Sequence, residues 1–130
     1  MIFKKKTIVF LFFMQIFFVF LQEKEIINAY NYRYIDSSAS ISKQKKIYQE
    51  AFTKKNKQIE CISNSFLTLT YLRLKKLPPA KEAIEKAKAL IPEIKDINTL
   101  GYYYYALYRY KYYIDDNTFQ EDLIKALSYF

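Results

Sequence analysis

Very few residues in this chain can end a helix. It contains one glycine, Gly101, and three prolines, Pro78, Pro79 and Pro92. After residue 24, apolar side chains recur at intervals of three and four, which is the period of a helix with one buried face. Because glycine and proline are the strongest local breakers of regular structure, the sequence predicts an all-α protein.

Polar turns and prolines divide the chain into helices. Asp36, Ser37, Ser38 and Ser40 form one turn and supply N-caps, because short polar side chains accept hydrogen bonds from free backbone N–H groups. The expected helices cover residues 25–35, 40–55, 60–76, 79–90 and about 96 or 98 to 114, and a sixth follows the turn Asp115-Asp116-Asn117. Pro79 opens the fourth of them and Ile91-Pro92 closes it. Thr118 and Glu121 have the spacing of a capping box for the sixth helix.

Residues 1–22 have the order of a secretory signal, with Lys4, Lys5 and Lys6 before an uncharged apolar run over residues 7–21. At about 1.5 Å per residue this run forms a helix of roughly 22 Å, shorter than the roughly 30 Å hydrocarbon core of a bilayer. The length favours a cleaved signal over a spanning helix. The bulky residues 18–21 leave no small residues at the expected cleavage site, so an uncleaved membrane anchor remains the alternative. The helical domain is expected to cover residues 25–130.

Residues 61–94 carry a pattern of small and large apolar side chains that fits two interlocking antiparallel helices. Its members are Leu67, Tyr71, Ala80, Ile84, Ala87 and Pro92. The pattern resembles the tetratricopeptide (TPR) repeat, which has about 34 residues per repeat. This resemblance implies a solenoid of about three antiparallel helix hairpins, with residues 61–94 as the clearest repeat.

The neighbouring repeats depart further from the family pattern. Leu100, Gly101 and Tyr104 repeat the order of the preceding hairpin, and a glycine there would let two helices approach closely. Residues 40–55 match as the second helix of a leading repeat that buries Ile47, Tyr48, Ala51 and Phe52, although Gln44 stands where a small residue is expected. Ala126 follows Ala80 by 46 residues, and the last repeat is incomplete at Phe130. The incomplete repeat predicts that these residues form either the front of a longer protein or the product of a truncated reading frame.

The composition gives little support for catalysis or for nucleic-acid binding. The chain has no histidine, one cysteine, Cys61, and no Gly-rich phosphate loop, so we expect neither an enzyme nor a bound cofactor or metal. Asp115, Asp116 and Glu121 are the only close acidic group, and we expect them to form an exposed turn. After residue 22 the chain has 18 basic and 13 acidic residues, and the lysines do not cluster into a nucleic-acid-binding motif.

Eight tyrosines crowd into residues 102–113, together with Arg109 and Lys111. On a helix they cover every face, so some must be buried while others line a surface. Tyrosine combines a large rigid contact area with a polar tip, which suits an interface for a peptide or for self-association. A tyrosine-rich core explains the same pattern, and the sequence leaves both interpretations open.

The TPR resemblance also indicates which residues face the concave side of the solenoid. In the clearest repeat these are Ile62, Ser65, Leu69, Leu72 and Arg73. Members of the family that clamp a terminal carboxylate use several basic residues at these places, and only Arg73 is basic here, so an apolar groove is expected instead. The candidate binding residues are Leu69, Leu72, Arg73, Tyr102, Tyr105, Tyr108, Arg109 and Tyr112.

These patterns favour an exported scaffold that binds a protein or peptide through its concave face, located in the periplasm or attached to the inner membrane. The signal followed by irregular repeats is also similar to the extracytoplasmic front of bacterial TPR sensors, which continue into a membrane helix and a histidine kinase or helix-turn-helix output domain. A membrane-anchored assembly factor, held in the membrane by residues 7–21, is the third expectation.

Overall fold

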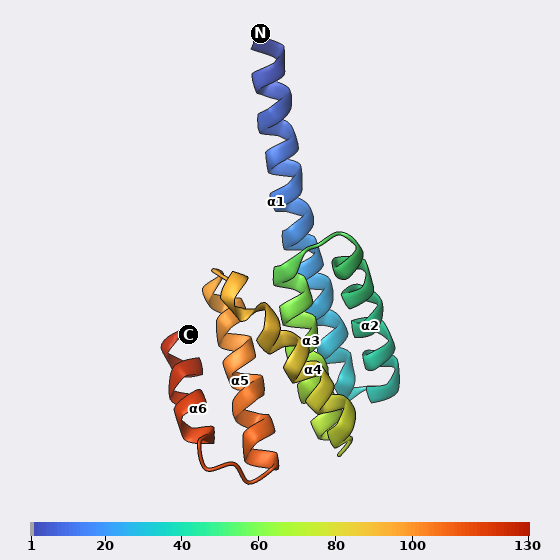
Figure 1. Cartoon of the computed structure of the whole chain (residues 1–130). Coiled ribbons are helices and arrows are strands. Elements are labelled where there is room, and N and C mark those ends of the chain that lie inside the picture. Colours follow the sequence, from blue (N-terminus) through green and yellow to red (C-terminus); the bar gives the residue numbers. More distant parts are fainter. Residues whose placement is uncertain (1) are drawn as a thin grey trace.

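The computed structural model describes residues 2–130, and the surroundings of individual side chains from residue 4 onward. The described residues form helices and short connections only, as the sequence predicts (Figure 1). The α-helices are α1 Ile2–Asn31, α2 Ser37–Thr53, α3 Lys57–Arg73, α4 Leu77–Leu90, α5 Ile97–Tyr113 and α6 Phe119–Ser128. Two 3-10 turns, η1 Tyr32–Tyr34 and η2 Ile91–Glu93, follow α1 and α4.

The N-terminal apolar run and the first helix of the domain form one continuous helix, α1. The sequence predicts a separate helix from residue 25, but Gln22, Glu23, Lys24 and Glu25 are good helix formers and nothing at this point breaks the backbone hydrogen bonding. The N-terminal half extends away from the other helices (Figure 1). The phenylalanines at positions 10, 12, 13, 17, 18 and 20 are exposed. The helix over Lys4–Tyr34 is long and apolar enough to cross a membrane by length and composition, and a signal sequence near the N-terminus meets the same criterion.

The C-terminal half of α1 is packed into the protein. Gln22 Oε1 accepts a hydrogen bond of 2.8 Å from Asn56 Nδ2, at the start of α3. Four residues later the side chain of Ile26 is fully buried, and Ala29 lies one turn beyond it. Both belong to a core cluster that includes Ile47, Ile59, Ile62 and Phe66. Packing therefore begins near Gln22, close to the expected end of the signal segment.

Helix α3 lies at the centre of the protein and contacts α1, α2, α4 and α5. Its sequence is rich in serine and threonine, yet the side chains from Ile59 to Leu72 are almost all buried. Three of these hydroxyl groups are satisfied locally, because Ser65, Thr68 and Thr70 each donate to the carbonyl oxygen four residues earlier at 2.8–2.9 Å. Small back-bonded side chains let four helices approach this one closely.

Gln44 of α2 is buried, although the repeat pattern predicts a small residue at its position. Its Nε2 group donates to Ser40 Oγ at 2.9 Å and to Thr70 Oγ1 at 3.0 Å, and Ser40 Oγ donates to the Ala29 carbonyl at 2.6 Å. This network joins α1, α2 and α3. Phe52 was expected in the core and is instead exposed; its ring lies 6.2 Å from that of Tyr48 on the same helix.

Small residues mark the contacts of α4 and α5. Ala80 and Ala87 are fully buried, and the Cys61 sulfur lies 3.9 Å from the Ala87 carbonyl oxygen. Gly101 of α5 was expected to bring two helix backbones together. Its nearest neighbour is instead the ring of Phe130, whose Cζ lies 2.6 Å from the position that a Cβ would take. The space beside Gly101 is therefore filled by a side chain that follows α6.

The N-caps of the helices agree with the sequence prediction at Asp36 and Asp96, whereas the cap at Asn56 was not predicted and one predicted cap is absent. Asp36, Asn56 and Asp96 each accept a hydrogen bond from the backbone N–H group three residues later. The capping box predicted for Thr118 and Glu121 is wrong, since the Thr118 side chain caps no backbone group of α6. Asp116 Oδ1 instead accepts from Thr118 N at 2.9 Å and from Thr118 Oγ1 at 2.7 Å. The hydroxyl is thereby held in the preceding turn.

Candidate functional site

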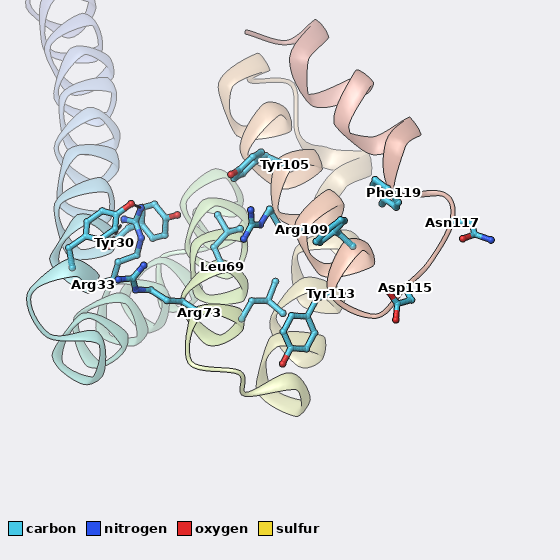
Figure 2. A pocket seen from close by; sticks show the side chains of 13 residues that line it. Tyr30, Arg33, Leu69, Arg73, Tyr105, Arg109, Tyr113, Asp115, Asn117 and Phe119 are labelled. Carbon is cyan, nitrogen blue, oxygen red and sulfur yellow. Dashed lines mark hydrogen bonds between the residues drawn. The ribbon is translucent and has the colours of Figure 1, made fainter.

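A groove of about 710 Å³ opens between the end of α1, the C-terminal halves of α3 and α5, and the start of α6 (Figure 2). Helix α3 contributes Leu69, Leu72 and Arg73 to its wall. The full lining consists of Tyr30, Arg33, Tyr34, Leu69, Leu72, Arg73, Tyr105, Arg109, Tyr112, Tyr113, Asp115, Asn117 and Phe119. Six of the eight candidate binding residues therefore line one groove: Leu69, Leu72, Arg73, Tyr105, Arg109 and Tyr112.

Tyr102 and Tyr108, the other two candidates, pack beside the groove rather than along it. The Tyr102 ring lies 5.0 Å from the Phe66 ring and 5.8 Å from the Phe130 ring. The Tyr108 ring centroid lies 5.9 Å from that of Tyr105, which is a wall residue of α5. It also contacts Tyr112 and Phe119 at 6.4 Å and 6.1 Å. Tyr108 thus contacts three aromatic side chains of the wall.

Two residues expected on the concave face are instead in the core. Ile62 and Ser65 are fully buried, because α1 covers the face of α3 that the repeat pattern assigns to a ligand. Ile62 packs with Ile26 and Ala29 of α1. Of the other residues expected on that face, Leu69 is partly buried, Leu72 is 8% exposed and only Arg73 is exposed.

The structure adds three residues from the end of α1 and from η1, namely Tyr30, Arg33 and Tyr34, which the sequence analysis did not assign to a site. Periodicity identifies the core face of this segment but not which distant helices lie opposite its other face. One sequence signal could have identified it: the tripeptide Tyr-Arg-Tyr occurs at residues 32–34 and again at 108–110. Both arginines of these tripeptides line the groove.

Arg33 is held in place by several contacts. Its Nη1 group donates to the Tyr30 carbonyl at 2.9 Å and to Asn31 Oδ1 at 3.3 Å, and its Nη2 group donates to the Tyr34 hydroxyl at 2.5 Å. The guanidinium carbon lies 3.5 Å from the Tyr30 ring centroid and 4.0 Å from that of Tyr34. Cation–π contacts of this kind hold the planar group against the ring faces. Tyr30 is itself stacked on Phe66, with ring centroids 4.4 Å apart.

Arg73 and Arg109 approach the groove from α3 and α5 (Figure 2). The Arg73 guanidinium carbon lies 5.0 Å from the Tyr34 ring, so Arg33 and Arg73 flank the same tyrosine. The ion pairs of the described side chains all involve lysines, at positions 57, 86 and 111. Within the part of the chain that the structure describes, the three arginines therefore have no carboxylate partner. Asp115 is the one acidic residue in the described lining.

The tyrosines of α5 divide between the core and the surface. Tyr103 is buried against Tyr104, with ring centroids 4.9 Å apart, and burial raises the pKa of its hydroxyl. Tyr105 and Tyr113 instead lie at the groove (Figure 2), and Tyr112 also belongs to its lining. Core packing and surface exposure, the two interpretations left open by the sequence, each apply to different residues of the cluster.

The groove is more polar than the apolar groove expected from the sequence. Five tyrosines and three arginines supply most of its lining, while Leu69, Leu72 and Phe119 are its apolar members. The reason for the difference is that Arg33 and Arg109 join Arg73 only through the packing of α1 and α5 against α3. A ligand would meet hydroxyl and guanidinium donors on an aromatic surface.

Other titratable groups are poorly suited to chemistry at this site. Cys61 is fully buried, and desolvation raises the pKa of its thiol to about 12, so little reactive thiolate forms near neutral pH. Asp116, in the turn after α5, has a lowered pKa because the Thr118 backbone and side chain donate to its carboxylate. Among the described residues, no group of three or more His, Cys, Asp and Glu side chains could hold a metal ion.

Comparison of the chain with protein-family models, with curated proteins and with solved structures gave no match.

Proposed function

We propose that this protein is an exported, TPR-like helical-repeat module that binds a peptide segment in the groove between α1, α3, α5 and α6, without catalysis. The observation that supports this most directly is the groove itself. Residues far apart in sequence converge on it, and they include six of the eight residues selected from the sequence alone.

The size and chemistry of the groove suit a short peptide. A volume of about 710 Å³ lies within the range of roughly 300–1,000 Å³ that is typical of ligand sites. Tyrosine and arginine are the residues that, with tryptophan, most often dominate binding energy at interfaces. Tyrosine has only two side-chain torsions to fix, so its large contact area costs little conformational entropy.

Export is supported by α1, whose exposed apolar half follows Lys4, Lys5 and Lys6. Positive charge before an apolar helix keeps that end in the cytoplasm, so the chain that follows would be translocated. The packed half of α1 starts near Gln22, and removal of the preceding residues would leave its core contacts in place. A periplasmic module, released or held at the inner membrane, is consistent with this arrangement.

Replacing Tyr112 by alanine is expected to weaken peptide binding by about tenfold, because truncation of an aromatic hot-spot residue costs on the order of 1–2 kcal/mol. The full chain in uncharged detergent micelles would first be used to select binders from a displayed library of random twelve-residue peptides. Fluorescence anisotropy of one selected peptide then gives the dissociation constants.

Phe52→Ala is the matched control, because Phe52 and Tyr112 expose 57% and 59% of their surface but Phe52 lies on α2, outside the groove. Equal weakening by both substitutions would place the peptide elsewhere on the molecule. Selection of no peptide beyond those retained by empty micelles would refute peptide binding altogether.

The unbroken course of α1 favours a second candidate function, the sensing front of a membrane-bound receptor with a kinase or helix-turn-helix output. The helix that leaves the apolar segment ends at the groove, where Tyr30 forms part of the wall. Occupancy of the groove would then act directly on the element that enters the membrane.

Intact mass of the native product, recovered separately from soluble and membrane fractions, distinguishes the two functions. A soluble species without residues 1–22 is the expected result for a released binding module. A membrane-bound species that keeps α1 whole and is larger than the 15.7 kDa of this chain would support the receptor instead.

A further inference from the structure

All three arginines of the chain line the same groove, while none of its lysines does. The sequence has 21 basic residues, of which Arg33, Arg73 and Arg109 are arginines and the other 18 are lysines. The arginines come from η1, α3 and α5, and the described lining includes every one of them and no lysine (Figure 2). The two kinds of basic residue are therefore separated in the fold: the arginines lie at the groove, and the lysines lie elsewhere.

Arginine and lysine differ in what they recognise. The guanidinium group is planar, always charged and weakly hydrated, and it presents a fork of N–H donors that matches the two oxygens of a carboxylate. It also stacks on aromatic rings, as Arg33 does on Tyr30 and Tyr34. Lysine supplies solubility equally well, so an arginine-only lining indicates a site for planar anions.

The groove has unsatisfied positive charge. Against three guanidinium groups the described lining offers one carboxylate, that of Asp115, and it forms no ion pair with them. The chain after residue 22 has an excess of five positive charges. Two copies of this protein would repel each other at the groove, whereas an acidic partner would be attracted to it.

The position of the groove favours an acidic peptide over an anionic lipid headgroup. Arg33 follows Leu21, at the end of the apolar run, by twelve positions. At 1.5 Å per residue, twelve positions correspond to about 18 Å along a helix. Tyr30 and Arg33, which line the groove, lie at the C-terminal end of α1 and just after it. The exposed apolar half is the opposite, N-terminal end of the same helix (Figure 1). With that half in a bilayer, the arginines would lie on the side of the domain away from the membrane, which favours a peptide as the source of the carboxylates.

We propose that the groove recognises an acidic peptide segment, in which Asp or Glu carboxylates pair with Arg33, Arg73 and Arg109 while neighbouring side chains pack on the tyrosines. This inference rests on the proposed peptide-binding function and specifies the chemistry of the peptide. Arg33 is already oriented by its hydrogen bonds to Tyr30 and Tyr34, so little freedom is lost when a carboxylate binds there.

The test selects displayed random peptides on the full chain in uncharged detergent and sequences those retained. Asp and Glu are expected to be enriched severalfold over the input library. Arg73→Gln and Arg109→Gln should each weaken binding of a synthetic copy of the leading peptide by about fivefold, as for a partly exposed charge pair. Replacing every Asp and Glu of that peptide by Asn and Gln should weaken its binding to the parent protein further.

Lys88→Gln is the matched control, since Lys88 is an exposed cation on α4 outside the groove. It removes the same charge and should leave affinity unchanged. An equal loss of peptide affinity with Lys88→Gln would show that net charge rather than the groove attracts the peptides. Unchanged enrichment of Asp and Glu on the triple variant Arg33→Gln/Arg73→Gln/Arg109→Gln would show the same, and either result would overturn this inference. Selection of peptides without acidic residues would overturn the inference but support peptide binding, and selection of none would refute the proposed function itself.

Discussion

Ile26→Ala is expected to lower the free energy of unfolding by about 2–5 kcal/mol, the range for truncation of a fully buried isoleucine. The Ile26 side chain is 0% exposed and packs with Ile47, Ile59 and Ile62. Loss of its outer carbons leaves a cavity between α1, α2 and α3 that these helices cannot fully close. Urea unfolding of the full chain in uncharged detergent, followed by the near-ultraviolet circular dichroism of the tyrosines, measures the change.

The same helix offers a matched control in Ile16→Ala. Ile16 is 52% exposed in the apolar half of α1, so its truncation should leave the unfolding of the domain unchanged. An equal effect of the two substitutions would mean that α1 contributes to stability through its length rather than through packing. No effect of Ile26→Ala would show that the C-terminal half of α1 is not part of the core.

Gln44→Ala is expected to cost about 2–3 kcal/mol, because it removes two buried hydrogen bonds and leaves a cavity where three helices meet. The free energy of unfolding of the Gln44→Leu variant should instead lie within about 1 kcal/mol of that of the parent protein. Leucine fills most of the same volume, and Ser40 and Thr70 keep their bonds to the carbonyl oxygens of Ala29 and Phe66. Leucine also removes the amide oxygen Oε1, which has no partner among the described residues.

Both variants of Gln44 are measured by the same urea titration. Gln49→Ala is the control, because Gln49 is exposed on the same helix and its replacement should change stability little. Equal destabilisation by leucine and alanine at position 44 would mean that the amide hydrogen bonds themselves, rather than the filled volume, hold α1, α2 and α3 together.

Much of the secondary structure could be predicted, because its signals are local. The start of α4 at the Leu77-Pro78-Pro79 segment and its end before Pro92 follow from the fixed φ of proline. The continuity of α1 could not be read from composition, since a change from apolar to charged residues alters solubility but does not break backbone hydrogen bonds. The sequence therefore predicts two separate segments where the structure has one continuous helix.

Burial was harder to predict than helix position. Ser63 and Thr68 are polar by sequence, yet both are fully buried, because α3 is surrounded by other helices. Phe52 is apolar, yet 57% of its surface is exposed. Such outcomes depend on which helices become neighbours, and an amphipathic period describes only one helix at a time.

The candidate site was predicted in part for the same reason. Leu69, Leu72 and Arg73 follow from their place on one helix, and Tyr105, Arg109 and Tyr112 recur on one face of another. The contribution of Arg33 depends on α1 reaching past α2 to lie beside α3, which is a tertiary contact. The rarity of arginine in the chain was the available signal, and composition alone did not show that the three would converge.

The unbroken helix α1 has a geometric consequence for a form of the protein that remains in a membrane. A helix turns by about 100° per residue. The number of residues between the bilayer and the domain therefore determines the angle, about the axis of α1, at which the groove opens. One residue inserted beside Gln22 would swing the groove through about a quarter of a circle, and a second would turn it roughly toward the opposite side. Partners fixed in the same membrane would meet the groove in only one of these orientations, so spacing within α1 would act as a determinant of recognition.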